Sequence, residues 1–387
     1  MIKFLSRALI GILIAGILTM WVRSLWALAL FQVGIFLLGA ICVLERVSSS
    51  RPLRKSILYI PLGVTAAWPL FQLAMHRSAY TWETQAATLR WCGMLVVFGL
   101  ALQVFEEGAV RQWFCRALLV FGSLLAAIST LQLFSAPGRV FWIFPTEYTG
   151  FVLGPFVYRN QYAAFIELLL PIAIAAVLDA RGSVFLMSCA AGVMYASVIA
   201  ASSRTGAILV SAEVVVVFTV AAYKHQLARS RIGLAVVSMI LLAGFLSVAV
   251  GWGTLWARFQ EAEPYQLRRE LLHSSADMVR AHPWMGIGLG TWATVYPAYA
   301  YFDDGRFVNQ AHNDWAQWAA EGGLPFVAML AWVFLWSVRS IRKSLWCVGV
   351  VSIFIHAFVD YPFEKQPLSA LTLVILGMVA ASQNSKK

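Results

Sequence analysis

The run SLWALALFQVGIFLLGAICVL, residues 24–44, contains no charged side chain over 21 consecutive positions. About 20 apolar residues in a helix cross the hydrocarbon core of a membrane, so this run predicts a transmembrane helix. Of the 387 residues, 60% are hydrophobic and only 12% are charged, whereas soluble domains carry roughly 25% charged residues. This composition excludes a pair of water-soluble domains, and we expect a chain that is dissolved in lipid.

Eleven further segments have the same character. Four are long (56–75, 117–136, 182–203 and 232–257), five are shorter (8–22, 91–105, 322–338, 344–359 and 366–383), and 160–178 and 205–223 each contain one acid, Glu167 or Glu213. We therefore predict an all-α integral membrane protein with about 12 transmembrane helices. Residues 8–22 could also form a signal-peptide core, but the apolar character continues past them, which favours a retained helix.

The basic residues orient these helices, because short cytoplasmic loops are enriched in Lys and Arg. With the N-terminus inside, 16 of the 29 basic residues lie in loops on that side: Lys3, Arg7, Arg46, Arg51, Arg54, Lys55, Arg111, Arg181, Lys224, Arg229, Arg231, Arg339, Arg342, Lys343, Lys386 and Lys387. Much of the formal net charge of +11 is thus a topology signal. Both termini are predicted to be cytoplasmic.

One stretch interrupts the succession of apolar runs. Residues 252–321 contain none of membrane length, and instead hold three prolines and a glycine-rich turn. We expect a single polytopic domain, 1–387, with a large external helical loop at 252–321 and a smaller one at 135–159. All five cysteines fall in predicted spans without Cys-x-x-Cys spacing, so neither a disulfide framework nor a structural zinc site is expected.

Several arginines fall on the external side, where the topology rule does not call for them. They are Arg159, Arg204, Arg258, Arg268, Arg269 and Arg280. The planar guanidinium presents a fork of donors that matches phosphate oxygens, so a group of arginines at the outer boundary suits a lipid-linked phosphate or diphosphate. The alternative for each one is an ion pair with a nearby acid, or a position among lipid head groups.

His312 precedes a span within Gln310-Ala311-His312-Asn313-Asp314-Trp315. A histidine here can be neutral at physiological pH and accept a proton from a hydroxyl group. The alternative is a plain helix start, in which Asn313 or Asp314 is the N-cap and His312 is merely polar. Periodicity alone favours that alternative.

Other polar residues allow weaker predictions. Asn160 and Glu167 are seven residues apart and share a helix face, which could lead towards a lipid-binding groove. His356 and Asp360 are four apart, so a hydrogen bond between them is plausible. The run Gly-Ile-Gly-Leu-Gly at 286–290 follows no strand and precedes no Lys-Ser/Thr, which argues against a nucleotide-binding loop and favours a tight turn.

Taken together, four stretches resemble the O-antigen ligase/polymerase superfamily of bacterial membrane glycosyltransferases. They are Tyr158-Arg159-Asn160-Gln161-Tyr162 with the helix that follows, Ser203-Arg204-Thr205-Gly206, Arg268 with the later His282-Pro283-Trp284-Met285-Gly286-Ile287-Gly288, and His312-Asn313-Asp314 with Glu321-Gly322-Gly323. Tyr158 replaces the usual first Asn, and the adjacent Arg269 leaves the register of the loop arginine open. The segment from His356 to Pro362 also looks like one found late in family members.

The resemblance implies a specific activity. Members transfer a glycan from undecaprenyl diphosphate to a hydroxyl acceptor at the periplasmic face of the bacterial inner membrane, are GT-C-like, and need no metal or other cofactor. It assigns the diphosphate to Arg204 and Arg268, with Arg159 and Arg280 as further candidates, and it makes His312 the base in an inverting reaction. Asn160, Glu167, Asn313 and Asp314 are expected to support this site.

Several functions remain open at this point. A ligase uses lipid A-core as acceptor, a polymerase uses a second lipid-linked repeat, and a protein O-oligosaccharyltransferase uses a protein. We favour the ligase slightly, because the superfamily is commonly described by that activity, and no nucleic-acid partner is expected. A flippase or other transporter is the alternative from another class, but transporters tend to show repeated halves, whereas here the polar residues gather in one non-repeated loop.

Overall fold

The computed structural model describes all residues except 148, 149, 151, 180–182, 225–229, 262–265, 302–304, 306 and 385–387. Four basic residues used to predict the orientation lie outside the described residues: Arg181, Arg229, Lys386 and Lys387.

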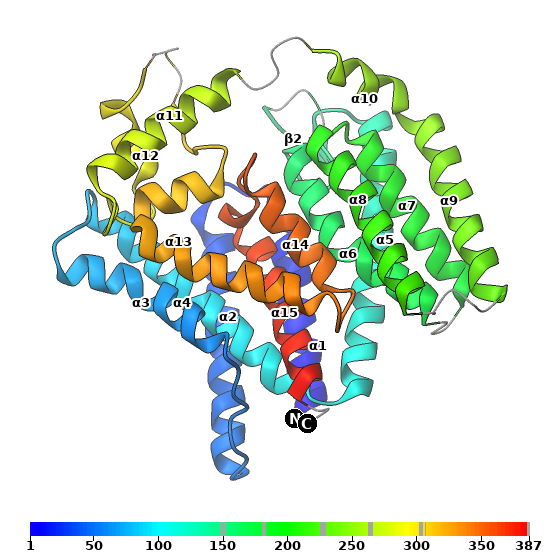
Figure 1. Ribbon diagram of the computed structural model, residues 1–387, viewed down its shortest axis with the longest axis horizontal. Helices are drawn as coiled ribbons and strands as arrows, with labels where there is room; N and C mark the ends of the chain where they lie inside the picture. Colours follow the sequence, from blue (N-terminus) through cyan, green and yellow to red (C-terminus); the bar gives the residue numbers. More distant parts are fainter. Residues whose placement is uncertain are drawn as a thin grey trace.

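The described chain is almost wholly helical (Figure 1). Its helices are α1 (Ile2–Leu18), α2 (Leu25–Ser48), α3 (Tyr59–Ala74), α4 (Thr81–Val104), α5 (Gly108–Ser135), α6 (Arg159–Leu178), α7 (Val184–Ala200), α8 (Arg204–Tyr223), α9 (Ser230–Val250), α10 (Trp252–Phe259), α11 (Gln266–Ala281), α12 (Trp292–Val295), α13 (Asp314–Ser340), α14 (Cys347–His356) and α15 (Gln366–Asn384), with 3-10 turns η2 (Tyr296–Ala298) and η3 (Pro362–Glu364). One short hairpin, β1 (Arg139–Val140) and β2 (Phe144–Pro145), departs from the all-α prediction within the smaller loop.

Each of the predicted spans lies on a helix, but the number of spans is not confirmed. Among the described residues, seven helices are long and apolar enough to cross a membrane, or eight if α9 and α10 form one bent span. The predicted run 232–257 is broken between Val250 and Trp252, where the two helices are bent by 77°. Helices α7 and α14 are apolar but shorter than that requirement. The protein is a multi-pass membrane protein.

Helix α6 forms the centre of the bundle. Nearly all of its residues are buried, whereas α2 exposes large apolar side chains such as Leu25, Leu44 and Val47 along its length. A polar solvent would disfavour such an exposed apolar face, so α2 is suited to contact lipid. The burial of α6 brings its first residues, Arg159 and Asn160, between elements that are remote in sequence.

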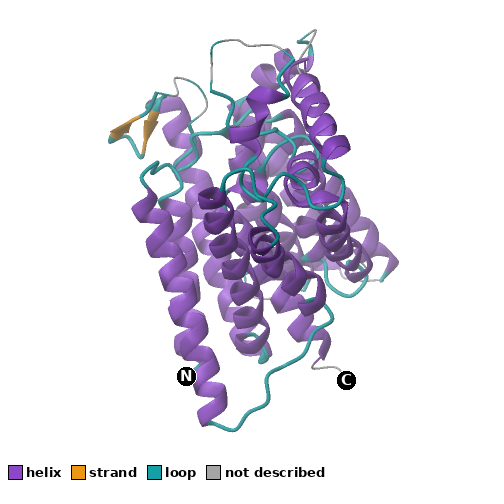
Figure 2. Ribbon diagram, turned by 90° about the vertical axis from the view of Figure 1, so that its left-hand side faces the viewer, coloured by secondary structure: helices purple, strands orange, loops and turns teal. Residues whose placement is uncertain are grey.

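Helices α10, α11 and α12 lie at the end of the bundle opposite to the start of α1 and the end of α15 (Figure 1). The view turned by 90° again places both termini towards one end of the bundle (Figure 2). The predicted large loop, 252–321, thus corresponds to these helices and the beginning of α13. Helix α13 is interrupted at Gly323, whose φ of 75° and ψ of 175° are not helical. A side chain there would meet the Trp284 carbonyl oxygen at 2.5 Å, so the close approach of two backbones requires glycine.

Candidate functional site

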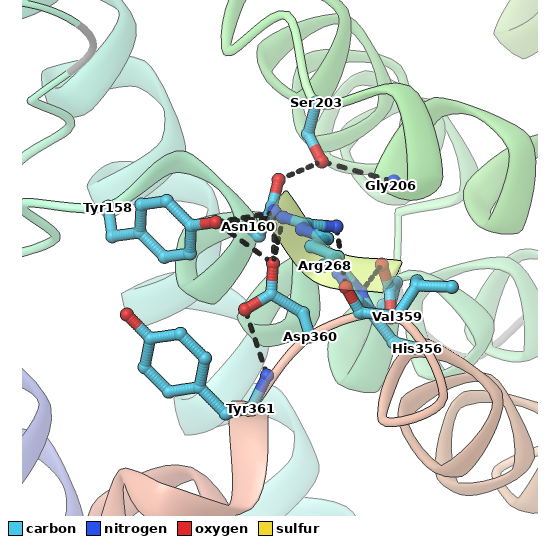
Figure 3. A network of polar contacts seen from close by, with 10 residues as sticks. Tyr158, Asn160, Ser203, Gly206, Arg268, His356, Val359, Asp360 and Tyr361 are labelled. Atoms are coloured by element: carbon cyan, nitrogen blue, oxygen red, sulfur yellow. Dashed lines mark hydrogen bonds and ion pairs between the residues drawn. The ribbon is translucent and has the colours of Figure 1, made fainter. Parts of the chain in front are cut away.

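A partly buried polar network joins the start of α6, α11 and the segment after α14 (Figure 3). The Arg268 Nη2 donates to the Tyr158 hydroxyl and to Asp360 Oδ2, both at 3.1 Å, and its Nη1 donates to the Val359 carbonyl at 2.5 Å. The Tyr158 hydroxyl also donates to Asp360 Oδ2, at 3.0 Å. Charge-assisted bonds of this kind are stronger than neutral ones, so the guanidinium is held in a fixed orientation.

Asn160 connects this network to the start of α8. Its Nδ2 donates to the Asp360 carboxylate, and its Oδ1 accepts from the Ser203 hydroxyl at 2.8 Å. Ser203 is the N-cap of α8, because its side chain accepts from the Gly206 N–H at 3.1 Å. The Asn160 side chain therefore ties the turn that carries Arg204 to the network around Arg268.

His312 lies against the tyrosines of the network. Its ring is 4.8 Å from that of Tyr361 and 6.4 Å from that of Tyr158, both in edge-to-face geometry. Its backbone has a φ of 52°, a conformation that costs energy for a residue other than glycine and is often found at functional sites. Ser202, just before the Ser203 turn, shares this conformation with a φ of 53°.

The environment of His312 favours the neutral ring. Burial lowers the pKa of His312 below its usual value; the Asp360 carboxylate opposes this shift and the Arg268 guanidinium adds to it. The Nδ1 atom is buried and has no hydrogen-bond partner among the described residues. A neutral imidazole at pH 7 can accept a proton from a hydroxyl group.

Asn313 and Asp314 hold the histidine segment in place. Asn313 is the N-cap of α13, with its Oδ1 accepting from the Ala316 N–H at 2.9 Å. The Asp314 N–H donates to the carbonyls of Ala357 and Asp360, and its Oδ2 accepts from the Phe363 N–H at 2.9 Å. The helix-start interpretation is thus confirmed for Asn313, and it fixes His312 beside Asp360.

The remaining predicted arginines have different surroundings. Arg204 Nη1 donates to the Arg258 carbonyl at 2.9 Å and to Glu261 Oε2 at 3.1 Å, so the ion-pair alternative applies to it. Arg159 is the first residue of α6, partly buried between Tyr158 and Asn160. Arg280 is exposed near the other end of α11 and pairs with Asp277.

Glu167 and His356 form a fully buried pair, with 2.8 Å between Oε1 and Nδ1. The expected side-chain bond between His356 and Asp360 is therefore wrong, since His356 is engaged across the bundle and Asp360 faces Arg268. Glu167 is buried two turns after Asn160 on α6, and the two side chains share no polar contact in the described network.

The glycine-rich run forms a tight turn, as predicted. Gly286, Gly288 and Gly290 have φ values of 66°, 109° and 85°. The Glu321 carboxylate accepts from the N–H groups of Gly290 and Trp292, at 2.9 and 3.1 Å. Within the described part of the chain, no three His, Cys, Asp or Glu side chains gather in a way that could hold a metal ion.

Asp360 and Tyr361 were missed as site residues. Their segment was noticed only for its likeness to a late family segment, and Asp360 was assigned to His356. Tyr158 was noted only as a departure from the family pattern, although its hydroxyl contacts both Arg268 and Asp360.

Comparison with known families supports the same region. A family model described as O-antigen ligase, Wzy_C, matches residues 189–331, which include Arg204, Arg268 and His312. This match supports the resemblance to the O-antigen ligase/polymerase superfamily over that part of the chain. No curated protein sequence matches the chain. The matched range leaves out Asn160 and Asp360, which the geometry adds to the candidate site.

Proposed function

We propose that this protein is a membrane glycosyltransferase of the O-antigen ligase type. It moves a glycan from undecaprenyl diphosphate to a hydroxyl of lipid A-core at the periplasmic face of the bacterial inner membrane. The observation that carries this proposal is the position of His312, an imidazole with a lowered pKa, beside the network that orients Arg268.

The reaction exchanges one bond for another at the anomeric carbon. The bond from that carbon to the diphosphate oxygen breaks, and a bond to the acceptor oxygen forms on the opposite face, which inverts the configuration. His312 takes the proton of the acceptor hydroxyl, and undecaprenyl diphosphate leaves with the electron pair of the broken bond. General base catalysis of this kind contributes about 10²- to 10⁴-fold.

Arginine charge supports the departure of the diphosphate. Arg268 is 23% exposed and is oriented by Tyr158, Asp360 and Val359, so its positive charge is fixed before substrate arrives. Arg204 follows Ser203, which is bonded to Asn160 of the Arg268 network. In the proposed complex, a phosphate oxygen would replace Glu261 as the partner of Arg204. Arg159, between Tyr158 and Asn160, is a further candidate for the same ligand. Because these cations neutralise the leaving group, the proposed reaction needs no metal, and EDTA should leave its rate unchanged.

The proposed orientation follows from charge and shape. Helix α1 begins, and α15 ends, at the end of the bundle opposite to α10, α11 and α12 (Figure 1). If basic loops face the cytoplasm, the external helices and His312 face the periplasm.

Reconstitution in vesicles tests the proposal. The purified protein is given a glycan linked to undecaprenyl diphosphate, with either lipid A-core or a second lipid-linked repeat, and the products are separated by length. A single transfer to lipid A-core is expected. Elongated lipid-linked glycan would make the protein a polymerase instead. Absence of product with both acceptors, together with movement of the donor across the bilayer, would favour a transporter.

A further inference from the structure

An ion pair outside the transfer machinery joins two distant parts of the chain. Arg90 on α4 and Glu364 in η3 are 274 residues apart, and Arg90 Nη1 lies 2.7 Å from Glu364 Oε2. Their side chains are 29% and 12% exposed, and both line a small cavity whose other lining residues are mostly apolar. Nothing in the proposed reaction uses this pair.

Glu364 ends the segment that forms one wall of the site. Residues 357–364 follow α14 and include η3, and three neighbours within them contact the site. The Val359 carbonyl and the Asp360 carboxylate accept from Arg268, and the Tyr361 ring contacts those of His312 and Tyr158. The position of this segment therefore decides how Arg268 and His312 are presented to substrate.

The segment is fixed from two directions. On one side, Asp314 bonds the backbone at Ala357, Asp360 and Phe363. On the other, Arg90 holds Glu364, and Gln317 Nε2 adds a weaker contact to Glu364 Oε1 at 3.4 Å. The ion-pair partner of Arg90 is Glu364 rather than Arg268 or His312, so Arg90 acts at a distance from the chemistry.

We propose that Arg90 is a positioning residue: through Glu364 it holds segment 357–364 so that Asp360 and Tyr361 face Arg268 and His312. The proposal rests on the proposed function. In a poorly solvated setting, loss of one partner leaves the other charge uncompensated, so Glu364 would turn towards water and draw the segment with it. Misplacement of reacting groups by about 1 Å can cost about 100-fold in rate.

The test compares Arg90→Gln with Arg54→Gln. Arg54 pairs with Glu106 just beyond the other end of α4, so its replacement removes an ion pair away from the site, while Glu106 keeps its second partner, Arg46. We expect Arg90→Gln to lower kcat per folded protein by about 10- to 100-fold, and Arg54→Gln by less than about threefold. Arg90→Lys, or the exchange Arg90→Glu with Glu364→Arg, should recover most of the loss.

The pH profile separates positioning from a general loss of fold. The Asp360 carboxylate raises the pKa of His312, so its displacement in Arg90→Gln should move the acid limb of kcat to lower pH. A merely structural role would reduce the amount of folded protein and leave this limb in place. An unchanged limb, with kcat per folded protein equal to that of Arg54→Gln, would overturn the proposal.

A measurement without substrate keeps the two proposals distinguishable. Hydrogen exchange of the peptide that contains Tyr361 and Phe363, whose N–H groups are bonded to Asp360 and Asp314, should be faster in Arg90→Gln and unchanged in Arg54→Gln. Equal protection in both variants would refute the anchoring even if the enzyme is active. Failure of the wild-type protein to transfer any glycan would refute the proposed function and leave the anchoring to be judged by exchange.

Discussion

Helix α11 carries one candidate phosphate-binding arginine near each end, and the two differ in what faces them. Arg268 is 23% exposed and is held by Tyr158, Asp360 and Val359. Arg280, twelve residues later and so about 18 Å along the helix, is 77% exposed and is paired only locally, with Asp277 at 2.5 Å. Both residues are arginines, so residue type does not distinguish them. The residues that surround and hold each side chain do distinguish them.

Replacement of His312 tests the chemistry beside Arg268, at the end of α11 where the arginine is held by several partners. His312→Ala should lower transfer by about 1,000-fold, because it removes the general base. Product formation in vesicles gives the rate, and the melting temperature of the purified variant serves as the control for folding. Wild-type activity in this variant would remove the base assignment.

Arg268→Ala should have the next largest effect, about a 100-fold loss, since it removes a pre-oriented charge at the diphosphate. Arg268→Lys keeps the charge but loses the fork, so it should recover only part of the activity. The donor concentration dependence measures both. If the lysine variant bound donor as tightly as the wild type, recognition by the planar fork would be wrong.

Asp360→Asn should produce a smaller change, visible in the pH dependence. The carboxylate raises the pKa of His312, so its neutralisation lowers that pKa further. A base is active when unprotonated, and the acid limb of kcat should therefore move to lower pH. A limb that moves to higher pH would contradict the electrostatic role of Asp360.

Arg280→Ala should have the smallest effect, less than about twofold, because an exposed ion pair contributes little. Transfer rates of Arg280→Ala and Arg268→Ala, measured under the same conditions, show whether the two arginines differ in substrate binding. Equal losses of activity in the two variants would show that the exposed end of α11 also binds substrate. The partners that hold Arg268 would then not explain a difference between the two arginines.

The sequence predicts the apolar helices well, because a helix that contacts lipid needs a continuous run of apolar residues, and such a run is visible in the local sequence. It also selected Arg204, Arg268 and His312 through short motifs. It did not find the partners of Arg268, because Asp360 is 92 residues away and only the folded chain brings them together. It paired His356 with Asp360 at helical spacing, whereas the structure pairs it with Glu167, 189 residues away.

The break in α13 was equally hidden. Gly322 and Gly323 were noticed as part of a motif, but the need for glycine at 323 arises from the Trp284 backbone, which no local pattern reveals. Arg90 gave no signal at all, since an arginine in an apolar helix has many explanations until its partner is known.

Gln72, near the end of α3, joins the glycine-rich turn and the first part of α13 to the bundle through its single side-chain amide. Its Nε2 donates to the carbonyls of Met285 and Glu321, and its Oε1 accepts from the Leu289 N–H at 3.0 Å. Without α3, the backbone groups of Met285, Leu289 and Glu321 would lose this partner together. We therefore expect residues 252–321, produced as an isolated fragment, to remain unfolded, so that any attempt to transplant this segment onto another protein has to include the end of α3.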